Sequence, residues 1–425
     1  MAGRGRIEDA EADGRLMAVA PSAELGARVD ELLRRRTEAN EGFFAAEADG
    51  IARLCHRMAE RFARGGRLLA VGVSPQARSD ARHVAVEFVH PVIVGKRALP
   101  ALAIGPESRS PAVQIELLAE PDDMVIAFGA ETTDAVRRAR ERRCLTIGFD
   151  PVGAEWAFEP PSDDAFVRQE LAETSYHLLW ELIHVFFEHK GLLEGRLTGS
   201  VHDVGASSFL YPFLSEEEHD LEAVTADVRA SISMKAREVG ELREQTLTEG
   251  SDELVSAAAV VRRSLDAGGK VLAFGNGGSA TDATDVAADL RTPPHGWPGR
   301  RALDLSEDSG ILTALANDIG PDVLFARQII AYGQAGDVAL ALSTSGNSTN
   351  IVAALDEARR RGLATVALVG YDGGRVAADR LADHVVVSRS QHIPRIQEAQ
   401  ASAYHVLREL VEIADATARD VESAA

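Results

Sequence analysis

The chain has 425 residues, of which 45% are hydrophobic and 26% charged, and this is enough for two globular domains of ordinary size. Its formal net charge of −21 would repel a phosphate backbone, so we expect no nucleic-acid partner. Two cysteines in so long a chain indicate a reducing compartment, and without a signal peptide or a run of about 18 uncharged apolar residues we expect a cytoplasmic protein with no membrane partner.

The first half of the chain alternates short apolar runs with longer polar stretches. Residues 1–23 are polar, and we expect a disordered tail. We expect strands at residues 67–71, 98–104, 124–129 and 144–149, followed by a closing helix over residues 165–189. Residues 191–221 link this half to the next. They include the apolar run FLYPFL (209–214), which predicts that the linker packs on a domain.

The second half repeats this alternation. We expect strands at residues 270–274, 301–306, 337–343, 364–371 and 384–388, helices over residues 279–290, 311–318 and 350–362, and a long closing helix. Short apolar strands that alternate with amphipathic helices predict an α/β fold with a parallel sheet covered on both faces. Ligands of such sheets bind beyond the carboxyl ends of the strands.

Three short motifs recur in the same order in both halves. GGRLLAVG (65–72) matches GGKVLAFG (268–275), and KRAL (96–99) matches RRAL (300–303). The pair Gln-Glu followed by Tyr-His occurs at residues 169–177 and again at residues 397–405. We therefore predict one duplicated domain, at residues 24–190 and 222–425, whose copies pack as a pseudo-dimer within the chain.

A hydroxyl-rich loop follows the strand at residues 337–343 and leads into a helix. Four hydroxyl side chains surround a glycine turn there: Ser343, Thr344, Ser345 and Ser348. The free N–H groups and the positive dipole end of the helix add donors, so the loop predicts a phosphate site that needs no Lys or Arg. A plain helix cap is the alternative, but one capping residue would be enough for that purpose.

A glycine turn, GNGGS (275–279), opens the first helix of the second half. Backbone can approach a ligand closely at such a turn. Gly275, Gly277 and Ala280 also fit the dinucleotide fingerprint, with Asp304 as the acidic residue that this alternative requires. A dinucleotide site would leave the hydroxyl-rich loop unexplained.

Four segments, in order, resemble the sugar isomerase (SIS) domain and in particular its phosphoheptose isomerase branch: GNGGSATDATDVAADL (275–290), ANDIG (316–320), STSGNS (343–348) and RIQEAQASAYH (395–405). The resemblance implies two flavodoxin-like three-layer αβα domains, each with about five parallel strands. It also implies assembly through helix bundles, active sites at subunit interfaces, and conversion of sedoheptulose 7-phosphate to an aldoheptose 7-phosphate.

The resemblance also implies roles for individual residues. Phosphate contacts fall on the four hydroxyls above, and further substrate contacts fall on Asn276, Gly277, Gly278, Ser279, Asn317, Asp318 and Gln397. Gln397 and His405 match two ligands of a zinc site that also does acid–base work. Where the family has a His and a Glu as the other two ligands, this chain has Asp285 and Asp289.

These two aspartates leave both the metal and the catalytic base open. Asp285, Asp289, Gln397 and His405 form an oxygen-rich set that suits harder divalent ions better than the family's mixed set. Isomerisation through an enediol needs a base and an acid or a metal, and we expect Asp289 as base and His405 as acid.

The first half retains metal-type residues but not the phosphate loop. His83, Glu87, Gln169 and His177 complete the family's quartet, whereas Glu131 follows the strand that should lead into hydroxyls. The first-half residues are either relics or part of a composite site that both halves build. We expect the chain as a whole to be a sugar-phosphate isomerase that forms homodimers. The alternative is a non-catalytic sugar-phosphate sensor or interaction protein with the same fold.

Overall fold

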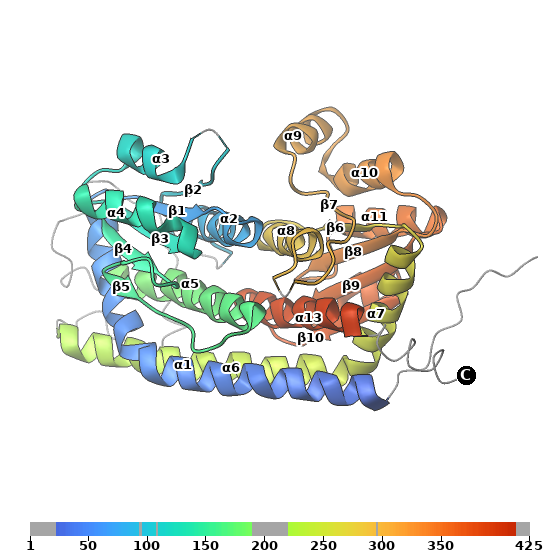
Figure 1. Ribbon diagram of the computed structural model, residues 1–425, viewed down its shortest axis with the longest axis horizontal. Coiled ribbons are helices and arrows are strands. Elements are labelled where there is room, and N and C mark those ends of the chain that lie inside the picture. Colours follow the sequence, from blue (N-terminus) through green and yellow to red (C-terminus); the bar gives the residue numbers. More distant parts are fainter. Residues whose placement is uncertain (1–22, 93–95, 108, 189–219, 295, 414–425) are drawn as a thin grey trace, which may run out of the picture.

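The computed structural model describes residues 23–92, 96–107, 109–188, 220–294 and 296–413 (Figure 1). The tail at residues 1–22 and nearly all of the expected linker, FLYPFL included, lie outside the described residues. The described chain forms two five-stranded sheets in which every strand pair is parallel. The expected α/β fold with two parallel sheets is therefore confirmed.

The first sheet has the strand order β2-β1-β3-β4-β5. Its strands are β1 (Leu68–Gly72), β2 (Ala101–Ile104), β3 (Met124–Phe128), β4 (Leu145–Gly148) and β5 (Trp156–Ala157). One face packs against α1 (Ala23–Ala63), α2 (Pro75–Val89) and α5 (Ala165–Glu188). The other face packs against α3 (Pro111–Leu118) and α4 (Thr133–Glu141), the latter preceded by the 3₁₀ turn η1 (Ala130–Thr132).

The second sheet has the order β10-β9-β8-β6-β7. Its strands are β6 (Val271–Phe274), β7 (Ala302–Asp304), β8 (Val338–Ser343), β9 (Ala364–Gly370) and β10 (His384–Ser388). One face packs against α7 (Ser251–Asp266), α8 (Gly278–Arg291) and α13 (Ile393–Ile413). The other carries α10 (Leu324–Tyr332), α11 (Thr349–Arg360) and α12 (Gly374–Ala378), while α9 (Ser309–Asp318) and the turn η4 (Pro321–Val323) precede α10.

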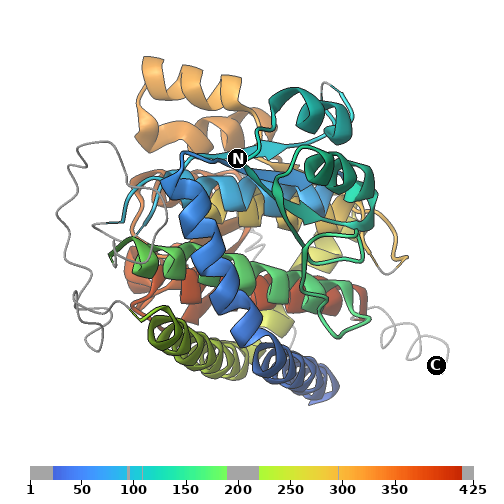
Figure 2. The same ribbon diagram turned by 90° about the vertical axis from the view of Figure 1, so that its left-hand side faces the viewer.

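Two long helices, α1 and α6 (Leu221–Glu249), exchange their ends between the domains (Figures 1 and 2). The first turns of α1 place Leu25, Val29 and Leu32 in the core of the second domain, while its later turns enter the core of the first. In turn, α6 begins in the first domain's core with Val224 and ends in the second with Leu247. The two domains are thus intertwined, and α5 of the first contacts α13 of the second.

Most strand predictions agree with the structure to within one to three residues, and the prediction for 384–388 agrees at both ends. The sequence analysis did not identify the full lengths of α1 and α6, nor the short edge strand β5. No helix in the described part of the chain is long and apolar enough to cross a membrane.

Arg36 joins α1 to both domains. Its side chain is 1% exposed and donates to Glu170 of α5 (2.9 Å) and to Glu409 of α13 (3.2 Å). Removing one partner of a buried ion pair leaves the remaining charges uncompensated, which is more costly than losing an exposed pair.

We expect Arg36→Ala to lower the free energy of unfolding by about 3–5 kcal/mol, measured by denaturant titration. Arg34→Ala, which removes an exposed pair with Glu38 on the same helix, is the control and should change it by less than about 1 kcal/mol. Equal effects of the two substitutions would contradict the role of Arg36 as an interdomain anchor.

Candidate functional site

Helices α2 and α8 pack antiparallel across the boundary between the domains. The Ser79 hydroxyl donates to the Thr281 carbonyl (2.8 Å), near the middle of the crossing. Near the start of α2, the Gln76 amide donates to Asp289 (3.2 Å) near the end of α8. At the opposite end of the crossing, a β-carbon added to Gly278 would lie 3.0 Å from Nε2 of His83. The start of each helix therefore faces the last turns of the other.

This crossing assembles a first set of four buried side chains: His83, Glu87, His177 and Gln397. Nε2 of His83 lies 3.3 Å from Nε2 of His177 and 3.2 Å from the amide nitrogen of Gln397. A carboxylate oxygen of Glu87 lies 3.8 Å from the same His83 nitrogen. All four side chains are at most 2% exposed. Three of them come from the first domain, and Gln397 comes from the second.

The donors of this first set fit a divalent metal such as zinc. Both oxygens of Glu87 and the amide oxygen of Gln397 are buried and have no hydrogen-bond partner among the described residues. The nitrogen and oxygen of a side-chain amide can exchange places by a half-turn of the group, and in Gln397 this half-turn would direct the oxygen toward His83. Two imidazole nitrogens, a carboxylate and an amide oxygen form the mixed donor set that zinc accepts.

Burial controls the ionisation of this region. It lowers the pKa of His177 to about 3 and raises the pKa of Glu87 to about 8. Burial, followed by repulsion from neighbouring carboxylates, raises the pKa of Asp80, Asp282, Asp285 and Glu173. The histidines are therefore neutral, which is the form that binds metals.

A second set occupies the pseudo-symmetric position and consists of Asp285, Asp289, His405 and Gln169. The Gln169 amide donates to Asp285 (3.0 Å), and Nε2 of His405 lies 3.5 Å from Asp289. The quartets expected from the sequence placed Gln397 with the aspartates and Gln169 with His83. In the structure the two glutamines are exchanged, so that Gln397 lies beside His83 and Gln169 beside Asp285. Each glutamine points across the boundary because α5 and α13 lie side by side between the domains.

Only the first set converges on one point. Within the described residues, groups of three metal-type ligands with all ligand atoms within 4.8 Å occur around His83, as His83–Glu87–His177 and as His83–Glu173–Asp282. In the second set, Gln76 contacts Asp289, and the Phe166 ring stacks on the His405 imidazole at 4.5 Å. Side chains of the first domain thus fill the space around the second set.

The hydroxyl-rich loop lies at the carboxyl end of β8, as predicted. The Ser343 and Ser345 hydroxyls accept from the backbone N–H groups of Gly346 (3.1 Å) and Asn347 (3.2 Å), which fixes the turn. Gly346 has a φ of +60°, and an added β-carbon would collide with the Gly373 carbonyl. Ser348 occupies the N-cap of α11, yet its hydroxyl makes no capping bond. Helix capping therefore does not account for Ser348.

The glycine turn lies next to this loop. The side-chain amides of Asn276 and Asn350 exchange two hydrogen bonds, of 3.0 and 2.9 Å. Gly277 has a φ of +59°, and Gly278 and Ser279 are buried at the start of α8. Gly278 then contacts the His83–Gln397 pair. The glycine turn therefore adjoins the hydroxyl-rich loop on one side and the first set on the other.

The second set lies farther away along α8. Asp289 follows Gly278 by eleven residues, which is about 16 Å along the helix at about 1.5 Å per residue. This end of α8 faces the turn of the first domain that leads into α2 and contains Ser74 and Gln76.

The corresponding loop of the first domain is closed by its own side chains. The Gly129 N–H donates to Asp150 (2.9 Å), whose other oxygen pairs with Arg168 (2.9 Å). The hydroxyls of Thr132 and Thr133 donate back to carbonyls of the same turn. An internal carboxylate thus takes a backbone donor that an anion would need.

Asn317 and Asp318 lie exposed at the end of α9, where the amide of Asn317 donates to Asp318 (2.8 Å). Their expected role as substrate contacts stays a prediction. Asp304 accepts from the Thr284 hydroxyl (2.7 Å) and the Ser306 N–H (2.7 Å), so its carboxylate is already engaged within the protein.

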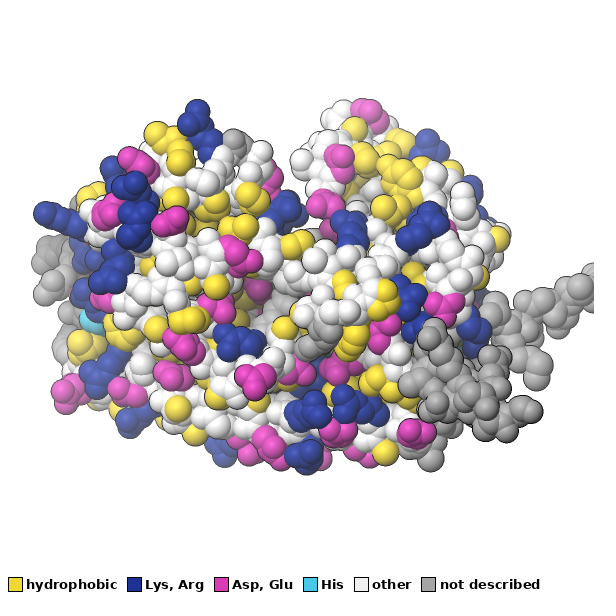
Figure 3. All heavy atoms as spheres, in the orientation of Figure 1, with side chains coloured by type: hydrophobic (Ala, Val, Ile, Leu, Met, Phe, Trp, Pro, Cys, Tyr) yellow, Lys and Arg dark blue, Asp and Glu magenta, His cyan; other side chains and the backbone are white. Residues whose placement is uncertain are grey.

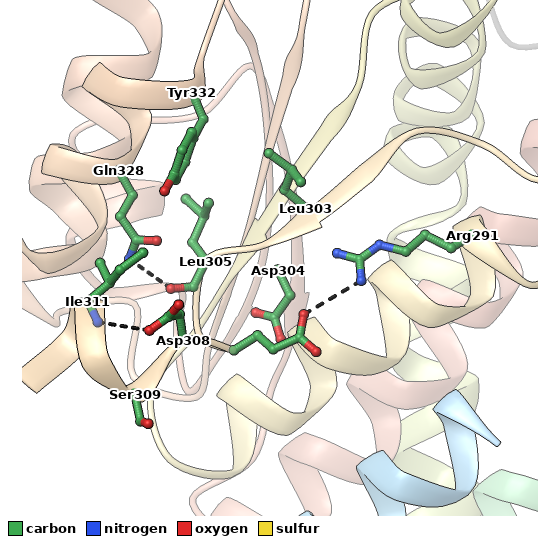
Figure 4. Close-up of a pocket in the computed structure, with 10 residues that line it drawn as sticks. Arg291, Leu303, Asp304, Leu305, Asp308, Ser309, Ile311, Gln328 and Tyr332 are labelled. Atoms are coloured by element: carbon green, nitrogen blue, oxygen red, sulfur yellow. Dashed lines mark hydrogen bonds and ion pairs between the residues drawn. The ribbon is translucent and has the colours of Figure 1, made fainter. Parts of the chain in front are cut away.

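An open cleft of about 620 Å³ lies beside β7, between the end of α8 and helices α9 and α10 (Figure 4). Its lining includes the carboxylates of Asp304, Glu307 and Asp308, and the one basic lining residue, Arg291, pairs with Glu307 (3.6 Å). An acidic wall of this kind disfavours a phosphate, so we do not assign the phosphate to this cleft.

The sequence analysis missed Asp282, Glu173 and Glu398, which are buried around the first set. It also missed Asp80, Gln76 and Phe166, which contact residues of the second set. Glu398 carried a readable signal because it belongs to the repeated Gln-Glu pair. Asp282 carried none, since its neighbour His83 comes from the other domain.

Comparison with known proteins places the chain in a family. The SIS domain matches residues 236–370. A phosphoheptose isomerase from Chlorobaculum tepidum is 45% identical over 177 residues, which are 40% of this chain and 83% of that protein. One from Thermodesulfovibrio yellowstonii is 38% identical over 172 residues, covering 40% of this chain and 85% of the relative. The chain therefore belongs to the SIS-domain family that includes these phosphoheptose isomerases.

One solved structure extends the likeness to nearly the whole chain. The C-terminal domain of glucosamine-fructose-6-phosphate aminotransferase from Francisella tularensis covers 91% of this chain and 95% of its own, with a TM-score of 0.55 and 12% identity. At that identity the likeness concerns the fold alone, and it includes both domains described above.

We expect the double substitution Ser345→Ala/Ser348→Ala to weaken binding of a phosphate monoester about 10²–10⁴-fold, because each lost charge-assisted hydrogen bond is worth about 1.5–3 kcal/mol. Isothermal calorimetry measures the affinity. Thr133→Ala in the first domain, whose hydroxyl bonds its own backbone, is the control and should bind normally. Unchanged affinity in the double variant would exclude this loop as the phosphate site.

Proposed function

We propose that the chain is a sugar-phosphate isomerase with one composite active site, built by both domains. The observation that carries this proposal is the position of His83 and Gln397 at Gly278, where an added β-carbon would lie 3.0 Å from Nε2 of His83 and would collide with the Gln397 amide. It supports a site in which residues of the first domain act beside the glycine turn of the second, which adjoins the hydroxyl-rich loop. The relatives' name supports a sugar phosphate as substrate.

The substrate we propose is sedoheptulose 7-phosphate, isomerised to an aldoheptose 7-phosphate. Its phosphate would accept from Ser343, Thr344, Ser345 and Ser348 and from the free N–H groups at the start of α11. With the phosphate held there, the reacting carbons at the other end of the sugar extend past Asn276 and Ser279 toward the first set. Anchoring the remote phosphate supplies binding energy that orients the reacting end.

Aldose–ketose exchange moves one proton between adjacent carbons and another between the two oxygens. We assign the carbon-bound proton to Glu87, whose carboxylate oxygens accept no hydrogen bond from the described residues. A divalent ion held by His83, Glu87, His177 and Gln397 would polarise the sugar's carbonyl oxygen. Complete burial excludes water, which strengthens each of these interactions.

Asp289 and His405, the pair expected from sequence, remain the competing assignment. Asp289 lies at the opposite end of α8 from the glycine turn. Gln76 and Phe166 occupy the space beside Asp289 and His405. These contacts favour Glu87 over Asp289 as the base.

Glu87→Gln and Asp289→Asn are a matched pair of substitutions that distinguish the two assignments. We expect Glu87→Gln to lower kcat about 10²–10⁴-fold with substrate affinity retained, since it removes the base but keeps the shape. Asp289→Asn should change kcat by no more than a few-fold. Conversion of sedoheptulose 7-phosphate, followed by NMR with and without added zinc, gives both rates.

The reverse pattern would assign the chemistry to Asp289 and His405. If the unsubstituted chain binds the sugar phosphate but forms no aldose product, it is a sensor with the same fold, and the isomerase proposal fails.

We also propose that two chains pair in solution. No residue of α9 is buried, and Ile319, Ile330 and Tyr332 are exposed on and next to α9 and α10. Figure 3 shows hydrophobic side chains gathered on this upper lobe. Light scattering tests the pairing through the mass of the particle.

A further inference from the structure

We propose that Asp282 and Glu398, both from the second domain, are positioning residues that orient the two histidines of the first domain. The inference rests on the proposed function, because it takes the Nε2 atoms of His83 and His177 as the ones that face the reacting centre. Each carboxylate holds the opposite ring nitrogen, Nδ1, of one histidine.

Glu398 is next to Nδ1 of His177. Its Oε1 lies 3.0 Å from that nitrogen, and both side chains are fully buried. Arg395, one turn earlier on α13, holds the same carboxylate oxygen at 3.1 Å and also pairs with Glu181 at 3.0 Å. Because Glu398 is fixed by Arg395, it can fix the imidazole in turn.

Asp282 is next to Nδ1 of His83. Its Oδ1 lies 3.8 Å from that nitrogen, and neither of its oxygens has a hydrogen-bond partner among the described residues. A fully buried carboxylate without a partner is costly, so a small rotation that accepts the Nδ1–H of His83 would satisfy both groups. The same helix supplies Gly278, so α8 both makes room for His83 and orients it.

A proton fixed on Nδ1 leaves the Nε2 lone pair free. In the first set, both Nε2 atoms face one another at 3.3 Å and face Glu87 and Gln397. Carboxylates that bond the far nitrogen of a metal-binding histidine set its tautomer and raise its basicity, and their loss lowers metal affinity about 10–100-fold. The second domain therefore contributes to the first set through its outer partners as well as through Gln397.

The pseudo-symmetric positions supply matched controls. Asp80 corresponds to Asp282 on the other side of the helix crossing, but its neighbour is the Gln169 amide (3.5 Å). Glu170 corresponds to Glu398 and bonds Nδ1 of His405 in the second set (2.9 Å). Both are buried carboxylates, so substituting them carries a similar structural burden without touching His83 or His177.

The test compares Asp282→Asn and Glu398→Gln with Asp80→Asn and Glu170→Gln. Two readouts are used: zinc affinity by competition with a chromogenic chelator, and ¹⁵N NMR of the imidazole rings with and without zinc. We expect the first two variants to lose about 10–100-fold in zinc affinity. Each should also shift the tautomer of its own histidine, because an amide can donate to Nδ1. The two controls should keep wild-type affinity and ring spectra for His83 and His177.

Equal losses in all four variants, or unchanged tautomers in the first two, would overturn the inference. Binding of two zinc ions, with one lost in Asp282→Asn, would make Asp282 a ligand together with Glu173 and would also overturn it. If a variant does not fold, the ¹⁵N spectrum of the unsubstituted protein tests the inference, which requires both imidazole rings to carry their proton on Nδ1. A chain that holds zinc in this way but does not isomerise the sugar leaves the inference intact and refutes only the proposed function.

Discussion

The antiparallel crossing of α2 and α8 is the contact on which the rest of the site depends. It brings the first turn of each helix against the last turns of the other, so residues far along one domain's helix meet the opening glycine turn of the other domain. Because both domains are built by the same repeat, the crossing creates two pseudo-equivalent positions. The exchanged ends of α1 and α6, together with Arg36, join the two domains.

The two positions differ in the side chains that surround them. At the second set, the Gln76 amide contacts Asp289, Phe166 covers His405, and Glu170 is kept ionised although burial opposes it, because Arg36 and His405 lower its pKa. At the first set, oxygens of Glu87, Gln397 and Asp282 have no hydrogen-bond partner among the described residues, and at the second set the same is true of Nε2 of His405. Buried polar groups without partners are rare in native structures, and they mark a place where a ligand completes the network.

Much of the fold could be predicted from the sequence because strands with continuous apolar runs and helices with apolar periodicity are local patterns. The strand at 384–388 and the loop at 343–348 are examples. The long helix α1 was not predicted, since its apolar face serves two cores in succession and its hydrophobic pattern changes partner midway. The edge strand β5 has only two residues, too few for any periodicity.

The candidate site was predictable in its residue types but not in its grouping. The repeated Gln-Glu and Tyr-His motif identified Gln169, His177 and their counterparts, and the family resemblance added His83 and Glu87. Which glutamine joins which set depends on the packing of α5 against α13, and no local pattern records that packing. The same holds for Gln76 and Phe166, whose neighbours lie in the other domain.

Fusing both copies in one chain changes what substitutions can do. In a symmetric dimer of identical chains, replacing the histidine and glutamate in the second half of the crossing helix would remove them from both sites at once. Here the replacement at Asp285 and Asp289 affects only the second set, while Asp150 and Glu131 alter only the first domain's loop. Each domain can therefore lose the half of the machinery that its partner supplies. We propose that the working set is the one that remains, His83, Glu87, His177 and Gln397, beside the glycine turn at Gly278.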